Sequence, residues 1–126
     1  MLIKTDILII GSGIAGLSFA LKAAQNFKVI ILSKSDIMES NTRYAQGGIA
    51  SVIAQADKFE SHIQDTLEAG AYLCDEQAVE NVVRAGPRLI KEILHLSVRF
   101  TKLNKKEFDL GREGGHSQRR ILHASD

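Results

Sequence analysis

Residues 7–16 read ILIIGSGIAG, four apolar residues followed by the pattern G-x-G-x-x-G. An unbroken apolar run is typical of a strand that is buried on both faces of a parallel sheet. The residues after the glycines repeat at helical spacing, with Ile14, Leu17, Leu21 and Ala24 on one predicted apolar face against the sheet. The glycine pattern therefore stands where it can bind a ligand, between a buried strand and a helix.

Each glycine of this pattern has its own physical role. Gly11 permits the tight turn, Gly13 lets the backbone approach a pyrophosphate, and Gly16 lets the helix pack closely on the strand. The start of the helix offers free N–H groups and a partial positive charge to phosphates. The alternative interpretation is a glycine turn that binds no ligand.

A second apolar run at residues 29–32 completes a strand–helix–strand unit with a right-handed crossover. The fold class is therefore α/β, with a Rossmann-like βαβ domain. The acidic residue that usually binds ribose hydroxyls at the end of this strand is missing, since no carboxylate precedes Asp36. Ser33 could bond a hydroxyl and Lys34 could approach a phosphate or the adenosine, and a solvated loop charge is the alternative for Lys34.

The rest of the chain predicts a loop at residues 41–48 and then three helices. Ser61 with Gln64 forms a capping box at the start of the first helix, and Asp75 caps the second. Gly86 with Pro87 ends the second helix and begins the third. Residues 98–103 predict a strand that returns through a hairpin turn at residues 104–107.

Composition excludes several classes of function. The 126 residues are 44% hydrophobic and 25% charged with a net charge of +1, which indicates one soluble domain without nucleic-acid or membrane partners. Cys74 is the single cysteine, so an internal disulfide is excluded and a reducing, cytoplasmic location is expected. We interpret it as a packing residue rather than a nucleophile. No residues have the spacing of metal ligands.

Three blocks, residues 6–16, 32–34 and 44–50, resemble the fumarate reductase and succinate dehydrogenase flavoprotein superfamily. That superfamily commonly has the Ser33-Lys34 pair in place of the acidic residue, so the resemblance implies FAD rather than NAD. It also implies cofactor contacts from Gly11, Ser12, Gly13, Ile14, Ala15, Gly16, Ser33, Lys34, Asn41, Thr42, Arg43, Tyr44, Ala45, Gln46, Gly47 and Gly48. Some relatives attach FAD through a histidine where this chain has Asn41, which implies non-covalent FAD here. Arg43 departs from the commoner apolar or aromatic residue.

Within the superfamily, residues 112–117 (REGGHS) and 119–124 (RRILHA) resemble the L-aspartate oxidases. Members that act only on dicarboxylates lack a glutamate at the position of Glu113. A carboxylate there suits a substrate with an α-ammonium group and would repel succinate or fumarate. The resemblance thus implies that Glu113 orients the substrate amine.

The implied activity is FAD-dependent oxidation of L-aspartate to iminoaspartate, with oxygen or fumarate as the acceptor, at the first step of quinolinate and NAD synthesis. Quinolinate synthase is then a candidate partner. We expect residues 1–126 to be the N-terminal part of the FAD-binding domain, because the chain stops at Asp126 inside what resembles a new element. The capping domain with its arginine acid/base, and a C-terminal helical domain, would lie outside it. Alternatives are a soluble fumarate reductase or succinate dehydrogenase, a non-catalytic FAD-binding remnant, or an NAD-binding βαβ protein.

Other polar residues have two interpretations. His116 could face flavin or substrate, or be a structural loop residue. His62 and His95 are expected at the surface or at helix ends. Arg119 and Arg120 could neutralise phosphates or substrate carboxylates, although a solvated pair or a salt bridge at the edge of the core is expected by default.

If the chain supplies half of an FAD site, the isolated 126-residue polypeptide should bind FAD weakly and should not oxidise L-aspartate. Titration with FAD and with NAD, together with an oxidase assay, measures both properties. Robust turnover by the isolated chain, or a preference for NAD, would contradict the interpretation.

Overall fold

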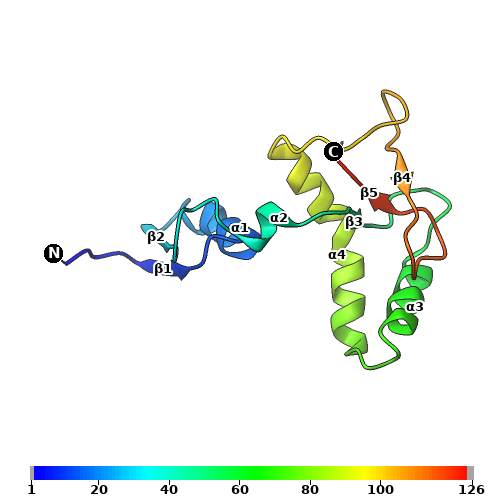
Figure 1. The fold of residues 1–126 in the computed structure, drawn as a ribbon, viewed down its shortest axis with the longest axis horizontal. Helices are drawn as coiled ribbons and strands as arrows, with labels where there is room; N and C mark the ends of the chain where they lie inside the picture. The colour runs from blue at the N-terminus through cyan, green and yellow to red at the C-terminus, as the bar shows by residue number, and fades with distance from the viewer. Residues whose placement is uncertain (1, 125–126) are drawn as a thin grey trace. The chain divides into compact units, whose positions relative to one another are not determined.

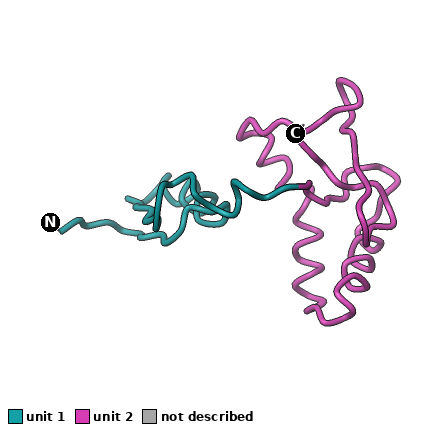
Figure 2. The backbone as a smooth tube through the Cα atoms, in the orientation of Figure 1, with its two compact units in different colours: residues 1–46 teal, residues 47–126 magenta. Residues whose placement is uncertain are grey.

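The computed structural model describes residues 2–124 and divides into two compact units, Met1–Gln46 and Gly47–Asp126 (Figure 2). Each unit has its own sheet. Because the division falls between Gln46 and Gly47, the predicted loop at residues 41–48 contributes to both units.

The first unit is a parallel βαβ element, as predicted. Strand β1 (Ile7–Ile10) leads through the glycine turn into helix α1 (Ile14–Ala23), and strand β2 (Val29–Leu32) follows (Figure 1). The strands pair in parallel from Ile7 opposite Val29 to Ile10 opposite Leu32. Strand, helix and strand lie where the apolar runs indicated, so the α/β fold class is confirmed.

The predicted contact face of α1 is wrong. Ile14, Leu17 and Leu21 are exposed, and Ala20 is the residue of the helix that is buried. Small side chains form the contact because Gly16 brings the helix backbone against the strand, where a larger residue would hold it away. The face of α1 that packs against the strand is therefore determined by small side chains and not by the apolar spacing alone.

The expectation of strands buried on both faces is also wrong for this unit. Along β1 partly buried and exposed residues alternate, and Leu8 and Ile10 are exposed. A sheet of two strands with one helix has cover for one face only. The predicted loop at residues 41–48 begins as a short helix, α2 (Asn41–Tyr44), and the Ser40 side chain caps it by accepting a bond from the Arg43 N–H.

Two helices dominate the second unit, α3 (Phe59–Ala69) and α4 (Glu76–His95), and they pack against each other. The predicted cap of α4 is confirmed, because the Asp75 carboxylate accepts the Ala78 N–H at 2.8 Å. The predicted capping box is wrong. Helix α3 begins at Phe59, so Ser61 lies within its first turn and its hydroxyl bonds other partners.

Pro87 does not end α4, contrary to the prediction. The helix continues through it, and the buried residues Val83 and Ile90 lie on either side. They are seven residues apart, which places both on one helical face. Burial of this continuous face offsets the backbone bond that proline cannot make.

Three short antiparallel strands complete the second unit: β3 (Ile49–Ala50), β4 (Leu110–Gly111) and β5 (Ile121–Leu122), in the order β3-β5-β4. Ile90, Phe100 and Leu122 form its core. Strand β5 is central, and its two residues are buried. It is the element that the sequence indicated near Ile121, and Ser125 and Asp126 lie outside the described residues.

The predicted strand at residues 98–103 is wrong, since that segment makes one bridge, Lys102 with Phe108. Its backbone instead bonds in two directions, with Thr101 N donating to His123 O and Thr101 O accepting from Asp109 N. The turn at residues 104–107 is confirmed, because the Asn104 side chain accepts the N–H groups of Lys106 and Glu107. Among residues 2–124, no helix has the length and apolar character required to cross a bilayer.

The proline inside α4 provides a test of the packing. Replacing Pro87 with Ala in the full-length protein should raise the free energy of unfolding by about 1–2 kcal/mol, since the helix gains a backbone bond and part of this is offset by a more flexible unfolded chain. Thermal unfolding measures the change. Val83→Ala on the buried face should have the opposite effect, and a lower stability of Pro87→Ala would show that the ring itself is needed.

Candidate functional site

The glycine turn between β1 and α1 has the backbone geometry of a phosphate cradle. Gly11 has φ +104°, in the region that residues with a side chain rarely adopt. A Cβ atom at Gly16 would lie 2.3 Å from the carbonyl oxygen of Gly11, so only glycine allows this approach. The roles predicted for these two glycines are borne out by the geometry.

The N-terminus of α1 has N–H groups available for an anion. Gly13 is the N-cap residue and provides no side-chain cap. The Ile14 N–H donates to Thr42 Oγ1 at 3.0 Å, and the N–H groups of Ala15 and Gly16 have no acceptor among residues 2–124. Free N–H groups at the positive end of a helix are the donors that bind a pyrophosphate, so these residues fit a dinucleotide.

Two further predicted contacts lie at this turn. The Ser12 hydroxyl is buried and lies 3.4 Å from the hydroxyl of Ser33, which follows β2. Thr42 lies beside Gly13, where an added Cβ would be 3.5 Å from Thr42 Oγ1. Residues from three separate segments of the first unit are thus brought together around one helix end.

Other predicted contact residues are exposed to solvent. Lys34 is exposed, as are Asn41, Arg43, Ala45 and Gln46. The Tyr44 hydroxyl donates to Glu39 at 2.7 Å, a bond that raises the pKa of Tyr44. Gly47 has φ +97°, and Gly48 belongs to the second unit, where Ile121 and Leu122 leave no space for a Cβ atom.

Glu113 lies in the loop between β4 and β5. The loop turns back through a bond from His116 N to Glu113 O at 3.3 Å, and Gly115 adopts φ +80° within it. The Glu113 side chain is exposed, and within the described chain its carboxylate makes no hydrogen bond or ion pair. Such a carboxylate is available to a cationic group of a ligand.

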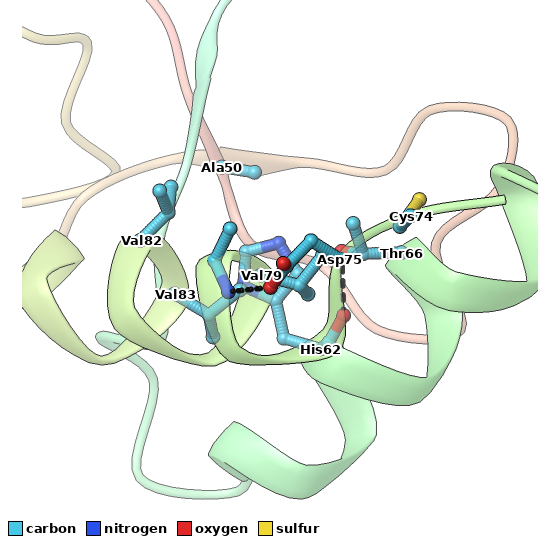
Figure 3. Close-up of a pocket in the computed structure, with 9 residues that line it drawn as sticks. Ala50, His62, Thr66, Cys74, Asp75, Val79, Val82 and Val83 are labelled. Atoms are coloured by element: carbon cyan, nitrogen blue, oxygen red, sulfur yellow. Dashed lines mark hydrogen bonds between the residues drawn. The ribbon is translucent and has the colours of Figure 1, made fainter. Parts of the chain in front are cut away.

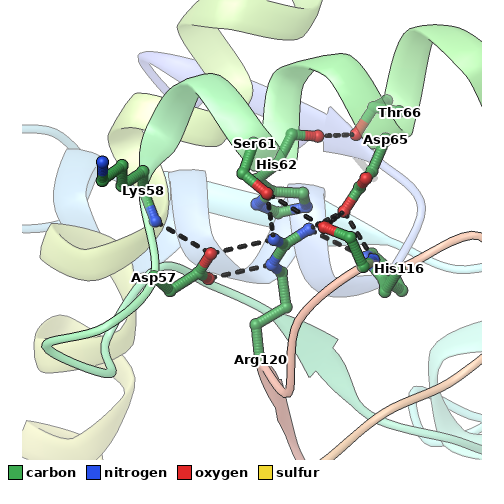
Figure 4. A network of polar contacts seen from close by, with 9 residues as sticks. Asp57, Lys58, Ser61, His62, Asp65, Thr66, His116 and Arg120 are labelled. Carbon is green, nitrogen blue, oxygen red and sulfur yellow. Dashed lines mark hydrogen bonds and ion pairs between the residues drawn. The ribbon is translucent and has the colours of Figure 1, made fainter.

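A buried ion network centred on Arg120 lies beside this loop, with His116 of the loop next to it (Figure 4). The Arg120 side chain is fully buried and donates Nε and Nη2 to the two carboxylate oxygens of Asp57 at 2.9 and 2.8 Å. Its Nη1 donates to Asp65 Oδ2 at 2.5 Å. Arg120 therefore belongs to the core of the unit and not to its edge, whereas Arg119 is exposed and bonds the Leu110 carbonyl oxygen.

Sequence patterns predict little of this network. Asp57 and Arg120 are 63 residues apart, so the salt bridge expected for the Arg119-Arg120 pair had no partner that local sequence could name. A second local indication is that Arg120 directly precedes the apolar pair Ile121 and Leu122. A charge next to a buried strand is a candidate for an internal partner.

His62 is buried beside the network, contrary to the surface position that was predicted. Its ring packs edge-on against the ring of His116 with the centroids 5.5 Å apart, and its Nδ1 atom has no hydrogen-bond partner in the described chain. Burial lowers the pKa of His62, and the positive charge of Arg120 acts in the same direction. His116 Nδ1 lies 3.3 Å from Arg120 Nη1, which supports the structural interpretation of His116. His95 is exposed at the end of α4, as predicted.

A cavity of about 480 Å³ lies between α3, α4 and β3 (Figure 3). It is lined by Ala50, His62, Thr66, Cys74, Asp75, Ala78, Val79, Val82 and Val83. Cys74 is partly buried, and its sulfur occupies the space that a side chain at Gly70 would need, which agrees with a packing role. No group of three candidate metal ligands occurs among residues 2–124.

A parallel βαβ unit with a glycine turn and an uncapped helix end defines a dinucleotide-binding protein of the Rossmann type. The family model described as "FAD binding domain" matches residues 6–126. The chain belongs to this FAD-binding family, and FAD is its cofactor.

The most similar curated proteins include L-aspartate oxidase 2-a, chloroplastic, from Nicotiana tabacum, which is 49% identical over 96% of this chain. L-aspartate oxidase from Vibrio cholerae is 51% identical over 98% of the chain. These matches cover 19% and 24% of the two relatives, so the chain spans about a fifth of their length. Among solved structures, an E. coli quinol fumarate reductase variant has a TM-score of 0.90 at 32% identity, over 98% of this chain and 22% of that one.

The buried His62 makes stability depend on pH. Its folded-state pKa lies below the ordinary 6.5, so the unfolded chain takes up a proton first as the pH falls below that value. The free energy of unfolding should therefore fall, by up to about 1.4 kcal/mol per pH unit, until the lower folded-state pKa is reached. Denaturant unfolding at about pH 7.5 and at about pH 5 measures this change. The free energy of unfolding should fall less for His62→Phe than for the unaltered full-length protein. Equal slopes for the two proteins would contradict this assignment.

Proposed function

We propose that the protein containing this chain is an L-aspartate oxidase, which converts L-aspartate to iminoaspartate with FAD as the oxidant. The single observation that carries the proposal is the exposed, unpaired Glu113 in a chain of the FAD-binding family. The curated relatives with this name, at 43–51% identity, support the same substrate.

FAD is held without a covalent bond in this proposal, because Asn41 stands where covalent relatives have a histidine. The turn at residues 11–16 would hold the pyrophosphate, and Ser33 with Lys34 would contact the adenosine half. Residues 41–48 provide the remaining contacts, with Thr42 already at the helix end. Residues 1–126 form the first part of the FAD-binding domain, and the capping and helical domains belong to the rest of the protein.

Bound FAD supplies a two-electron acceptor for the hydrogen on the substrate Cα atom. The residues of this chain bind and orient. Glu113 accepts hydrogen bonds from the α-ammonium group and thereby fixes the Cα–H bond in one direction. It acts as a binding residue, and the acid/base arginine lies outside residues 1–126.

Oxygen or fumarate then serves as the final electron acceptor, and iminoaspartate proceeds toward quinolinate and NAD. Quinolinate synthase would consume this product, and we propose it as a partner. The single cysteine supports a reducing compartment, and we propose the cytoplasm. The tobacco and rice relatives are described as chloroplastic, which applies to those proteins.

A soluble fumarate reductase is the second candidate, favoured by the structural similarity to quinol fumarate reductase. Charge discriminates between the two. A dicarboxylate without an ammonium group gains nothing from a free carboxylate such as Glu113 and is repelled by it.

Replacing Glu113 with Gln in the full-length enzyme should therefore raise the KM for L-aspartate by roughly 10- to 100-fold, because a charge-assisted hydrogen bond to a cation is lost. Use of fumarate should stay unchanged or improve. Steady-state kinetics with each substrate measure the difference.

Glu76→Gln is the matched control, since it removes the same charge from the exposed first turn of α4. It should leave both KM values unchanged. Turnover of fumarate without turnover of L-aspartate in the unaltered enzyme, together with an unchanged or lower KM for fumarate in Glu113→Gln, would favour the fumarate reductase candidate. Loss of FAD from the purified variant would show instead that Glu113 supports the cofactor site.

A further inference from the structure

The loop that carries Glu113 lies along one face of α3. Ser61, Asp65 and Ala69 follow each other at intervals of four residues, so they form one row on the helix. Ser61 Oγ lies 2.9 Å from Ser117 Oγ, and a Cβ atom at Gly115 would be 3.4 Å from the Ala69 side chain. The loop thus follows this row for two helical turns.

Asp65 makes the strongest contacts of the row. One carboxylate oxygen, Oδ2, accepts the N–H and the hydroxyl of Ser117, both at 2.8 Å. The same atom accepts Arg120 Nη1 at 2.5 Å. Ser117 is four residues from Glu113, and the backbone bond from His116 to Glu113 closes the turn between them. A shift of the Asp65 carboxylate would therefore move the turn.

Arg120 holds Asp65 in a fixed place. Its other nitrogens are engaged by Asp57, which leaves Nη1 as a rigid donor toward Asp65. Burial acts to raise the pKa of Asp65, but the bonds from Ser117 and Arg120 outweigh it and lower the pKa below its ordinary value. The carboxylate is consequently ionised near neutral pH and keeps all three bonds.

We infer that Asp65 is a positioning residue for substrate selection, which fixes the Glu113 loop on α3 through Ser117 and Arg120. The inference rests on the proposed role of Glu113 toward the α-ammonium group. Asp65 does not touch the substrate. Its effect on KM is confined to ligands that Glu113 recognises, whereas its support of the fold through Arg120 would appear as lower stability and not as a change in substrate preference.

The test uses the full-length enzyme with Asp65→Asn, Glu113→Gln and the double variant. Asp65→Asn keeps the shape but loses the charge, so the KM for L-aspartate should rise roughly tenfold, as for other residues that orient a ligand-binding group. The KM for fumarate and the FAD content should stay unchanged. The double variant should be no worse than Glu113→Gln, because the two residues act through one contact.

Glu68→Gln is the matched control on the same helix, where the carboxylate bonds Gln64 and not the loop. It should leave the KM for L-aspartate unchanged. Ser117→Ala removes the hydroxyl bond and keeps the ion pair, so it should show the same pattern at smaller size. If Asp65→Asn fails to fold, the KM values of Ser117→Ala test the inference instead.

Additive effects of Asp65→Asn and Glu113→Gln would overturn the inference and leave the role of Glu113 intact. Equal increases of the KM for aspartate and fumarate would also overturn it, since they indicate a general structural role. No effect of Glu113→Gln would remove the proposed role of Glu113 and the inference with it, so the two failures are distinguishable.

Discussion

The second unit depends on one buried arginine. Arg120 directly precedes the central strand β5, and its guanidinium group joins that strand to Asp57 before α3 and to Asp65 within it. A buried charge without its partner is strongly destabilising, by about 3–5 kcal/mol, so the three side chains must stay together. This requirement fixes the distance between strand and helix more narrowly than apolar contacts would, because hydrogen bonds have a defined length and direction.

The loop that carries Glu113 is fixed as a consequence of this pairing. It leaves the sheet at β4, returns at β5 and is bonded to α3 at Ser117. A binding residue is more effective on a rigid loop, because no conformational entropy is then lost in ordering the loop when the ligand binds. Structural and functional demands on residues 112–120 are therefore met by the same set of bonds.

In the first unit, glycines and not charged side chains determine the geometry of the turn between β1 and α1. Gly11 and Gly16 were identified from the sequence because a left-handed turn and a close helix contact each require the absence of a side chain. Thr42 at the helix end was named only through the family resemblance, since a contact between residues 28 positions apart has no local signal. The apolar face of α1 was assigned incorrectly for a related reason. The spacing of apolar residues does not show which side chains are small enough to pack against the strand.

The sequence by itself determined the βαβ unit, the cap at Asp75, the turn at Asn104 and the FAD-binding family, because each rests on neighbouring residues or on a motif of fixed spacing. Only the tertiary structure decided that α4 continues through Pro87, that His62 is buried, and that Arg120 pairs with Asp57 and Asp65. These features depend on burial against distant segments. The free energy of burying a continuous face or of pairing a buried charge exceeds the local preference of a proline, a histidine or an arginine.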